Sequence, residues 1–515
     1  MDQQTNYKLK IDFLISSDVH LNHPTQTTLE PIFKKCNGCK RRRKVFNETD
    51  QICYQCYKAK KIPLSGNKVI DDFIKFTLTN YCKKEGGMEF VPYEKFEAIE
   101  FIAEGGFSQI YKATWIDGPI KNWNEENQKY DCYGEMEVAL KELNNSESIN
   151  SRELNELKVY YDFVSKWKPV EKDAKKDRKF NEEYYVNLSD YNFINICYGI
   201  TQNPITKNFM IITDYYGKGD LAHYIADNFF NYPWYDKLDI LQNIASGLKN
   251  IHNANIIHKD YHSGNIFVVN PISAITGDLG LSKSAIESLD DENEIYGIIP
   301  YVAPEVLQGQ KYTKASDIYS FGMIMWELMT GRRPFWDKNH DTELIIEICD
   351  GVRPPIVTNA PEGYVELMKE CWHSDPNKRP TANDLSKIFD EGGKLHWSIN
   401  RIEIIKSPDI GPITNNPNAI YKSRPLSAMI KSAESTRSLK IQRYKPFNED
   451  KRKRDDDLIE DTGNNDKTIK KIKLNKNDDD YLSKELEFDI DNINISKFNK
   501  FNDSYYTTKE IGFDI

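Results

Sequence analysis

One short polar stretch constrains the fold of this 515-residue chain more than any other, because residues 258–265 read HKDYHSGN. A long run with the apolar spacing of an amphipathic helix precedes it, and the short apolar run IFVV follows it. Asp260 and Asn265 are therefore expected on one loop between a helix and a strand. A carboxylate on such a loop can accept a proton from a hydroxyl group, and an amide oxygen suits a hard cation such as Mg²⁺.

Two further segments supply charged groups that could act on the same cation and on bound phosphates. Asp278, in the tripeptide DLG, lies 13 residues beyond Asn265 and can bring a carboxylate to the same cation. Far upstream, Lys141 ends the strand-like run VALK, from which an amine can reach bound phosphates. Glu156, on the helix expected next, could hold that amine in place, with Glu153 as the competing candidate. Each feature is weak alone, but their order and spacing together indicate phosphoryl transfer.

These residues, in this order, resemble the protein kinase fold, and residues 96–390 look closest to its tyrosine-kinase-like group. The resemblance implies an α+β, bilobal domain with a β-rich N-lobe and an α-helical C-lobe. It also implies a serine/threonine-type protein kinase that uses ATP and Mg²⁺ in intracellular signalling. The catalytic positions that it implies are Lys141 for ATP, Asn265 and Asp278 for Mg²⁺, and Asp260 for the acceptor hydroxyl.

The resemblance also implies where the nucleotide lies. Two of the three glycines usual in the phosphate-covering loop are replaced by Ala103 and Ser108, and Gly105 is kept. Small side chains still let the backbone approach phosphate, although less freely than glycine does. The implied ATP-binding positions are Ala103, Gly105, Gly106, Ser108, Ile110, Ala139, Lys141, Glu156, Thr213, Asp214 and Tyr215.

Three more positions are implied to stabilise the domain. Glu305, in the APE sequence that closes the activation segment, should form a buried ion pair with Arg379. Asp317 should hold the catalytic loop through the backbone of that loop. All three residues are expected to support the site without reacting.

The sequence gives weaker evidence about which type of residue accepts the phosphate than about the fold. Lys259 replaces the usual arginine of the catalytic loop, which weakens the expectation of activation by loop phosphorylation. His262 and Ile298 stand where serine/threonine kinases usually carry lysine and threonine. Neither change creates the motif of dedicated tyrosine kinases, so a serine/threonine acceptor is favoured over a dual-specificity or tyrosine kinase. Candidate phosphorylation sites on the activation segment are Ser282, Ser284, Ser288 and Tyr296.

Four cysteines near the N-terminus form two CxxC pairs separated by 13 residues, namely Cys36, Cys39, Cys53 and Cys56. Four thiolates at this spacing complete a tetrahedral Zn²⁺ site, which in such closed sites is structural, and free thiols are the alternative. The basic tip at 41–43 suggests a second alternative, a nucleic-acid-binding zinc module, although a solvated zinc-ribbon loop is favoured.

Changes in composition, together with residues that interrupt helices and strands, divide the chain into five parts. We expect a flexible N-terminus (1–30), a zinc-ribbon-like module (31–62), a helical linker (68–95), a kinase domain (96–395, with an N-lobe at 96–216 and a C-lobe at 217–395) and a low-complexity, mostly disordered tail (400–515). Two polar stretches in the N-lobe, 117–135 and 166–183, are predicted to be exposed insertions.

The tail contains a weak repeat, YLSKELEFDI at 481–490 and YTTKEIGFDI at 506–515. The two copies could be docking peptides for partner proteins, or their similarity could be a chance result of the biased composition. Basic runs at 451–454 and 467–473 could form a two-part nuclear-import signal, and mixed-charge tails also produce such runs by chance.

The net charge of −10 argues against binding nucleic acid through the overall field of the protein. Residues 1–30 lack a secretory signal pattern, and no apolar run approaches the roughly 18–20 residues that span a bilayer. We therefore expect a cytoplasmic or nuclear enzyme without a membrane segment, whose partners are its protein substrates. A nucleotide-binding pseudokinase that acts as a scaffold is the main alternative.

Overall fold

The computed structural model describes residues 33–80, 87–105, 108–147, 154–166, 193–284, 294–357, 360–390, 404 and 406–443. All of them belong to one compact unit, Met1–Lys445. Glu153, Gly106, Ser288, the insertion at 167–183 and the tail features beyond residue 443 lie outside the described residues. Within the described part, no helix combines the length and apolar character needed to cross a membrane.

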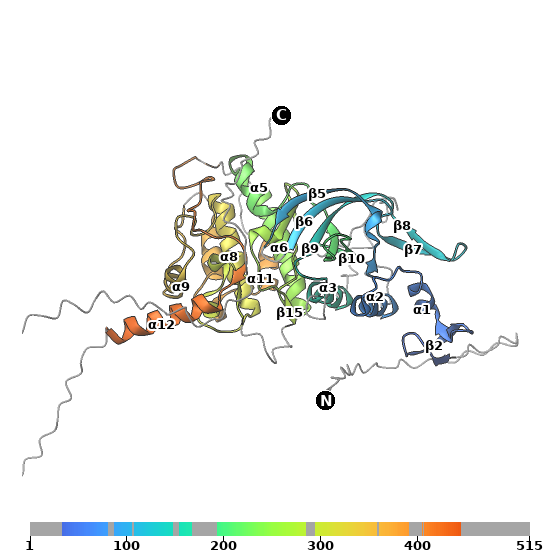
Figure 1. Ribbon diagram of the computed structural model, residues 1–515. Coiled ribbons are helices and arrows are strands. Elements are labelled where there is room, and N and C mark those ends of the chain that lie inside the picture. Colours follow the sequence, from blue (N-terminus) through green and yellow to red (C-terminus); the bar gives the residue numbers. More distant parts are fainter. Residues whose placement is uncertain are drawn as a thin grey trace, which may run out of the picture. The chain divides into compact units, whose positions relative to one another are not determined.

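A six-stranded sheet with the order β4-β10-β11-β9-β6-β5 forms the first half of the kinase-like region (Figure 1). Its neighbours are antiparallel except for the parallel pair β4 and β10. In β9 the side chains of Val138 and Leu140 are buried, so the alternation of a strand turns Ala139 and Lys141 to the other face. The strands are β4 (Glu89–Phe90), β5 (Phe96–Glu104), β6 (Ser108–Trp115), β9 (Met136–Leu143), β10 (Cys197–Gln202) and β11 (Phe209–Asp214).

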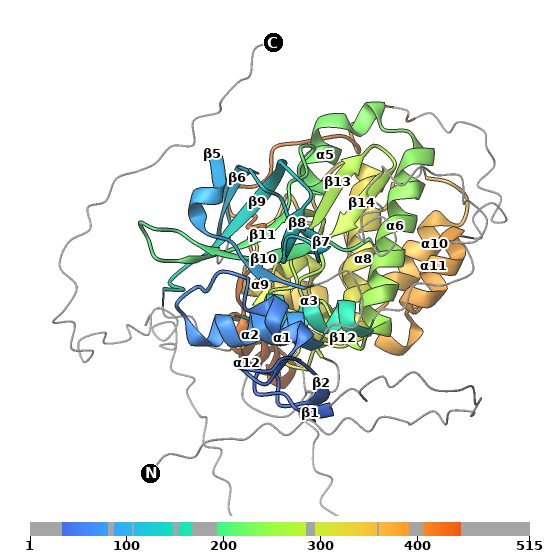
Figure 2. The ribbon, with the colours of Figure 1, turned by 90° about the vertical axis from the view of Figure 1, so that its right-hand side faces the viewer.

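The second half is helical, as the resemblance implied, and Figure 2 shows α6, α8, α10 and α11 together on one side of the sheet. Its centre is α8, in which every residue from Ser316 to Thr330 is buried. The helices are α5 (Leu221–Asn228), α6 (Trp234–Asn253), α7 (Pro304–Leu307), α8 (Lys314–Thr330), α9 (Thr342–Cys349), α10 (Tyr364–Cys371) and α11 (Ala382–Asp390). The α+β prediction with a β-rich N-lobe and a helical C-lobe is therefore confirmed.

Short elements complete this lobe and shape its loops. Single 3₁₀ turns lie next to the functional segments at Ser263–Asn265 and Ile299–Tyr301, and elsewhere at Tyr93–Lys95, Phe229–Asn231 and Pro376–Lys378. The two-stranded sheets are β12 (Ile256–Ile257) with β15 (Lys283–Ser284), and β13 (Ile266–Asn270) with β14 (Ser273–Thr276). The first of these pairs ties the catalytic loop to the start of the activation segment, 278–305.

A separate small core lies at the N-terminus. Strands β1 (Phe33–Lys35), β2 (Arg42–Asn47) and β3 (Ile52–Cys53) form a three-stranded sheet, and α1 (Tyr54–Ala59) follows directly. The next helix, α2 (Lys68–Asn80), packs its buried Ile70 and Ile74 into the same core as α3 (Asn155–Lys166). Helix α2 thus connects the cysteine module to the N-lobe.

One sequence expectation differs from the structure in the N-lobe. The expected helical linker at 68–95 is helical at Lys68–Asn80, while Glu89–Phe90 joins the sheet as a strand. The stretch 117–135, expected to be an exposed insertion, is mostly exposed or half-buried and forms a hairpin of β7 (Ile120–Asn124) and β8 (Lys129–Cys132). Trp123 explains the hairpin, because its ring packs edge-on against Tyr130 with centroids 4.9 Å apart.

The largest difference concerns the start of the predicted tail. Residues 406–437 are packed against the C-lobe, with a short strand β17 (Arg424–Pro425) and the first part of a helix α12 (Ser427–Arg443). The polar composition misled the prediction, because this segment has no core of its own. It instead buries a few isolated apolar side chains in the core of the C-lobe, namely Ile410, Leu426, Ile430 and Ala433.

Candidate active site

Three charged side chains from three elements meet at one point. The Lys141 ammonium on β9 lies 2.9 Å from Glu156 Oε2 and 2.6 Å from Asp278 Oδ1. Glu156 reaches it from the first turn of α3. The neighbouring Asn155 fixes that turn, because its side-chain amide donates to the carbonyl oxygens of Gly280 (2.9 Å) and Ser282 (3.0 Å). The helix is thereby clamped to the segment that carries Asp278.

The electrostatics of this cluster favour the charged forms of Lys141 and Asp278, while burial raises the pKa of Glu156. The side chains of Lys141 and Glu156 are only 14% and 13% exposed. Burial acts against the ammonium, but the carboxylates of Asp278 and Glu156 outweigh it and raise the pKa of Lys141. Burial likewise acts against the Asp278 carboxylate, but Lys141 and a hydrogen bond from the Gly280 amide (3.1 Å) lower the pKa of Asp278. Lys141 is therefore a fixed positive charge at the base of this site.

The catalytic loop is held by Asp317, as the resemblance implied. Its two carboxylate oxygens accept the backbone N–H groups of His258 (2.9 Å) and Lys259 (3.0 Å). His252 adds a contact of 2.8 Å to the same carboxylate. Lys259 has φ 71°, a left-handed conformation that costs free energy in a side-chain-bearing residue, so the contacts to Asp317 stabilise a strained turn.

Asp260 and Asn265 lie on the same face of this loop. The Asn265 side-chain NH₂ donates to the Asp260 carbonyl (2.8 Å), so its amide oxygen is the atom left to act as a ligand. His262 accepts the Gly264 amide at Nδ1 (3.1 Å) and therefore carries its proton on Nε2 when neutral. That Nε2 lies 3.6 Å from Asp260 Oδ2. Burial acts against the Asp260 carboxylate, but His262 and a hydroxyl hydrogen bond from Ser423 lower its pKa.

The residues expected to surround the nucleotide lie on three neighbouring strands and the hinge. Ala103 pairs with Ile110 across β5 and β6, and Ile110 lies opposite Lys141 across β6 and β9. The Gly105 amide donates to the Ser108 carbonyl (2.7 Å), which closes the phosphate-covering loop in spite of the missing glycines.

The hinge residues follow at the end of β11. Thr213 is buried, and Ala139 lies opposite it in the register of β9 and β11. The Asp214 carboxylate accepts the Tyr198 hydroxyl (2.6 Å), so this side chain is used within the sheet. Tyr215 lies under the ammonium of Lys112, which is 4.8 Å from the ring centroid. The backbone of the hinge is consequently the part that can face an adenine base.

The expected buried ion pair is confirmed. The Arg379 guanidinium donates from Nη1 and Nη2 to the two oxygens of Glu305, each at 2.7 Å. Both side chains are almost completely buried. Of the candidate phosphorylation sites, Ser282 is fully buried and donates to the His258 carbonyl (3.1 Å), so it is not accessible to a kinase in this state.

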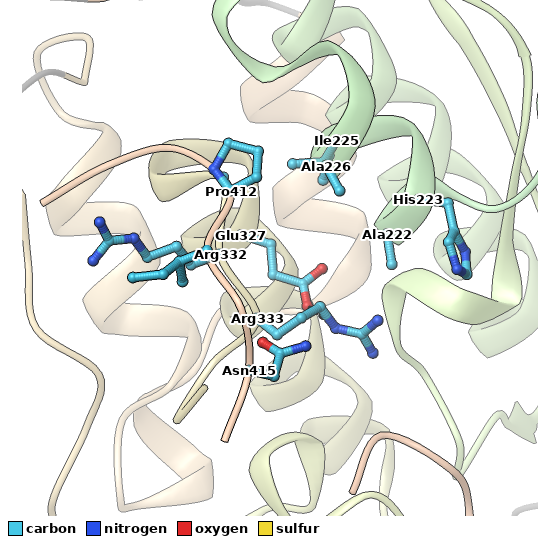
Figure 3. Close-up of a pocket in the computed structure, with 11 residues that line it drawn as sticks. Ala222, His223, Ile225, Ala226, Glu327, Arg332, Arg333, Pro412 and Asn415 are labelled. Carbon is cyan, nitrogen blue, oxygen red and sulfur yellow. Dashed lines mark ion pairs between the residues drawn. The ribbon is translucent and has the colours of Figure 1, made fainter. Parts of the chain in front are cut away.

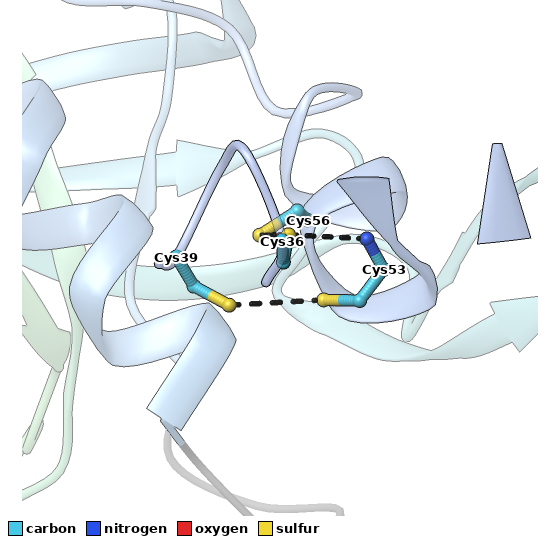
Figure 4. Close-up of side chains that lie close together, drawn as sticks. All are labelled: Cys36, Cys39, Cys53 and Cys56. Carbon is cyan, nitrogen blue, oxygen red and sulfur yellow. Dashed lines mark hydrogen bonds between the residues drawn. The ribbon is translucent and has the colours of Figure 1, made fainter. Parts of the chain in front are cut away.

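The four cysteines converge in the small N-terminal core (Figure 4). Their sulfur atoms all lie within 4.8 Å of one another, with Cys36 and Cys56 at 3.6 Å and Cys39 and Cys53 at 3.8 Å. A tetrahedral Zn²⁺ with Zn–S bonds of about 2.3 Å requires sulfur separations of about 3.8 Å. The donor set and its spacing therefore fit zinc.

The local backbone is adapted to this arrangement. A Cβ at Gly38 would lie 2.6 Å from the Cys56 sulfur, so only glycine fits this knuckle. Burial acts against a Cys36 thiolate, but the backbone N–H groups of Cys53, Cys39 and Gly38 lower its pKa to about 6. Arg43, from the basic tip, donates to the Thr79 carbonyl (2.8 Å) and approaches Cys53 Sγ (3.9 Å), so it fastens the module to α2.

Two features of the site were not predicted from the sequence. His262 was recognised only as a replacement for lysine, whereas the structure places it beside Asp260. Ser423 lies 163 residues beyond Asp260, and its hydroxyl donates to Asp260 Oδ2 at 2.6 Å. No local motif signals this contact, because it depends on the path of the C-terminal segment.

Comparison with known proteins agrees with this geometry. Residues 161–389 match the family model described as protein tyrosine and serine/threonine kinase. A probable serine/threonine-protein kinase of Dictyostelium discoideum is 36% identical over 180 residues, 35% of this chain and 11% of that protein. Ephrin type-A receptor 5 of Gallus gallus is 32% identical over 193 residues, 36% of this chain and 19% of the receptor.

A third relative is the protein R818 of Acanthamoeba polyphaga mimivirus, whose name assigns it provisionally as a serine/threonine-protein kinase/receptor. It is 33% identical over 183 residues, 35% of this chain and 11% of the viral protein. The chain thus spans between about a tenth and a fifth of the length of these three relatives. The matched region includes the catalytic loop, the DLG tripeptide and the Glu305–Arg379 ion pair. The chain therefore contains a protein kinase domain of the tyrosine-kinase-like type.

Proposed function

We propose that this chain transfers the γ-phosphate of ATP to serine and threonine hydroxyls of proteins. The observation that carries the proposal is the convergence of Lys141, Glu156 and Asp278 beside the loop that presents Asp260 and Asn265. These groups provide one fixed cation, two oxygen ligands for Mg²⁺ and one base.

The donor set fits Mg²⁺–ATP. Asp278 uses Oδ1 for Lys141 and Gly280, so Oδ2 is the oxygen that it would offer to Mg²⁺, together with the amide oxygen of Asn265. When bound, Mg²⁺–ATP supplies the transferable phosphoryl group and neutralises its developing charge. Lys141 would hold the α- and β-phosphates, and the Glu156 carboxylate keeps the amine oriented.

Asp260 would orient the acceptor hydroxyl and take its proton. Its lowered pKa keeps it ionised at neutral pH, and its Oδ2 already accepts a hydroxyl hydrogen bond in this structure. Serine/threonine specificity is supported by the names of two relatives, and a tyrosine acceptor is the alternative suggested by the ephrin receptor.

A phosphate-transfer assay tests this function. Purified full-length chain is incubated with labelled ATP, Mg²⁺ and peptide libraries that carry either serine and threonine or tyrosine. We expect label in the serine/threonine library and a loss of about 10²-fold or more for Asp260→Asn, because the base is removed. Asp227→Asn, on the exposed side of α5, is the matched control and should keep full activity. Equal label from wild type and Asp260→Asn would favour the pseudokinase alternative.

We also propose that the four-cysteine centre binds one structural Zn²⁺. The sulfur spacing and the glycine knuckle support it. A module with only a few buried residues gains its stability from such an ion, since metal binding contributes directly to folding. Cysteine patterns that bind metal instead of forming disulfides are typical of reducing compartments, which supports the expectation of a cytosolic or nuclear setting.

A further inference from the structure

The segment that follows the kinase domain passes beside the catalytic loop. We call residues 406–437 the docked segment. Its residue Ser423 donates a hydrogen bond of 2.6 Å from Oγ to Asp260 Oδ2. This distance is within the range in which a general base accepts the proton of a reacting hydroxyl. The preceding Lys422 lies 3.8 Å from Glu104, beside the phosphate-covering loop, so Ser423 lies between that loop and the catalytic base.

The backbone that directly follows Ser423 is aligned by the activation segment. Strand β17 (Arg424–Pro425) pairs antiparallel with β16 (Tyr296–Gly297). The Leu426 amide donates to the Ile295 carbonyl (2.7 Å), and the Ile295 amide donates to the Ser427 hydroxyl (2.8 Å). A peptide that adds a strand to an existing edge is held by main-chain hydrogen bonds, which fix its register. Ser423 is therefore held in register with the base and is not a loose contact.

Side-chain anchors on both sides make the docking specific. Leu426 is completely buried in the C-lobe core. The Tyr421 hydroxyl donates to the Pro334 carbonyl (2.9 Å), and the Arg333 guanidinium lies 4.3 Å from the centre of the Tyr421 ring. Arg424 donates to the His340 carbonyl. Tyrosine and arginine anchors in packed sites often contribute much of the binding free energy of an interface, and the cation–π contact adds to it.

The rest of the docked segment follows the C-lobe surface on both sides of this point. Upstream, Pro412 and Asn415 form one wall of a pocket whose other side is made by α5 and Arg333 (Figure 3). The Gly411 amide donates to the Thr330 carbonyl (2.7 Å), at a place where a Cβ would lie 2.4 Å from the Phe230 ring. Downstream, α12 packs against α9, and Arg437 pairs with Asp350 at 2.7 Å.

We propose that Ser423 is an intramolecular phosphoacceptor and that residues 421–427 occupy the groove that takes protein substrates. The proposal rests on the proposed kinase activity and names its first substrate, the chain itself. A serine at this position, and not a tyrosine, also agrees with a serine/threonine acceptor, since the short serine side chain reaches Asp260 from a backbone paired with Gly297.

The reaction balances with Mg²⁺–ATP as the co-reactant. Ser423 Oγ attacks the γ-phosphorus, a new O–P bond forms, and the bond from that phosphorus to the β,γ-bridging oxygen breaks. The hydroxyl proton passes to the Asp260 carboxylate, and ADP leaves. The products are phosphoserine at position 423, ADP and one proton.

Phosphosite mapping on the full-length chain tests the proposal. Wild type, Ser423→Ala and Ser435→Ala are incubated with ATP and Mg²⁺ and analysed by peptide mass spectrometry. Ser435 is an exposed serine on α12 and serves as the matched control. We expect up to one phosphate at residue 423 in wild type and in Ser435→Ala. Its first-order rate constant should stay within twofold over a 100-fold dilution, because the acceptor is in the same molecule. Asp260→Asn chain mixed with wild type should remain unlabelled at Ser423.

Three outcomes overturn the proposal. If an added serine/threonine peptide library is labelled while Ser423 is not, the docking assignment is wrong and the proposed function stands. If labelling at Ser423 rises in proportion to protein concentration and Asp260→Asn chain is labelled in trans, Ser423 is an ordinary substrate. A protein that labels no substrate at all overturns the proposed function and this proposal together.

Hydrogen–deuterium exchange without nucleotide provides a readout that does not depend on activity. Peptides that cover residues 421–427 should exchange at least about tenfold more slowly than an unstructured chain, because the Leu426 amide is hydrogen-bonded. Leu426→Asp should abolish this protection, and Ala428→Asp, at an exposed position of α12, should retain it. Exchange of the wild-type segment at the unstructured rate would contradict the proposal.

Discussion

At the scale of single residues, buried charges in this domain fall into two groups. Lys141 and Arg379 are neutralised by carboxylates, which is how proteins retain charge in a low-dielectric interior. Lys237 is different. It is fully buried on α6, its ammonium has no hydrogen-bond partner among the described residues, and it lies 4.1 Å from the centre of the Phe229 ring. Its ionisation should therefore affect stability directly.

The first prediction concerns Lys237. Burial lowers its pKa to about 7, whereas an unfolded lysine titrates near 10.5. Between these values the unfolded state binds more protons, so wild-type stability should rise as pH increases from about 7 to about 10. Lys237→Met removes this dependence. The variant should gain on the order of 3 kcal/mol over wild type at pH 6.5 and progressively less towards pH 9.5.

Urea unfolding at pH 6.5 and pH 9.5 measures this difference. Lys249→Met is the control, because Lys249 is partly exposed on the same helix and bonds Ser386 at 2.8 Å. The change in its unfolding free energy at each pH is the reference for replacing a lysine on this helix. Parallel pH profiles for wild type and Lys237→Met would show that the burial of Lys237 does not control its charge.

At the scale of elements, the C-terminal segment and the cysteine module each depend on one kind of interaction. The docked segment relies on strand pairing and on Leu426, whose side chain fills a site in the C-lobe core. The cysteine module buries Ile52 and its cysteines but little else. Each element should therefore detach or unfold while the kinase domain stays folded.

The second prediction concerns Leu426. A tethered segment occupies its groove at an effective concentration in the millimolar range, so it should compete strongly with added substrate. Leu426→Asp should raise kcat/KM for an added peptide by about tenfold or more, with an unchanged KM for ATP. Ala428→Asp should leave both constants unchanged. An unaltered kcat/KM in a Leu426→Asp protein with native circular dichroism would mean that the segment does not block the groove.

The third prediction concerns zinc. Elemental analysis of freshly reduced protein should find about one zinc per chain, and Cys53→Ser should lose it because three thiolates no longer close a tetrahedral site. The control is Cys132→Ser, since Cys132 is exposed on β8 and lies outside the cluster. Zinc-free wild-type protein would refute the assignment. Zinc removal should increase exchange in residues 33–59 and leave the C-lobe protected.

At the scale of the whole molecule, contacts between distant parts of the chain hold the C-lobe and the site together. Glu305 and Arg379 lie 74 residues apart and join the end of the activation segment to the last part of the domain. Asp317 fixes the catalytic loop from a separation of 58 and 59 residues. Loss of such a contact should therefore affect the entire domain.

The fourth prediction concerns this long-range ion pair. Arg379→Met leaves the Glu305 carboxylate buried without its partner, which typically costs about 3–5 kcal/mol. For a domain of this size, the thermal midpoint should fall by about 6 °C or more. Lys378→Met, at the exposed neighbouring position, should change it by less than about 2 °C. Equal midpoints for the two variants in differential scanning calorimetry would contradict the structural role of the pair.

Local sequence patterns were enough to predict the fold class and to propose the chemistry of the site. The order of Lys141, Asp260, Asn265 and Asp278, with helix and strand periodicities around them, indicated a bilobal kinase domain. The CxxC spacing was equally local. The exposed insertion at 117–135 was predicted, but its hairpin was not, since the hairpin involves aromatic packing of Trp123, which a polar composition conceals.

The folded path of the chain sets which distant groups meet. It turned His262 towards Asp260, engaged the Asp214 side chain with Tyr198, and placed Ser423 on the catalytic base. The polar composition from residue 400 onward predicted a disordered tail. Composition indicates only whether a segment has enough apolar residues to form a core of its own. A segment that instead inserts single side chains such as Leu426 into an existing core carries no such signal, since the apolar surface that stabilises it belongs to another part of the chain.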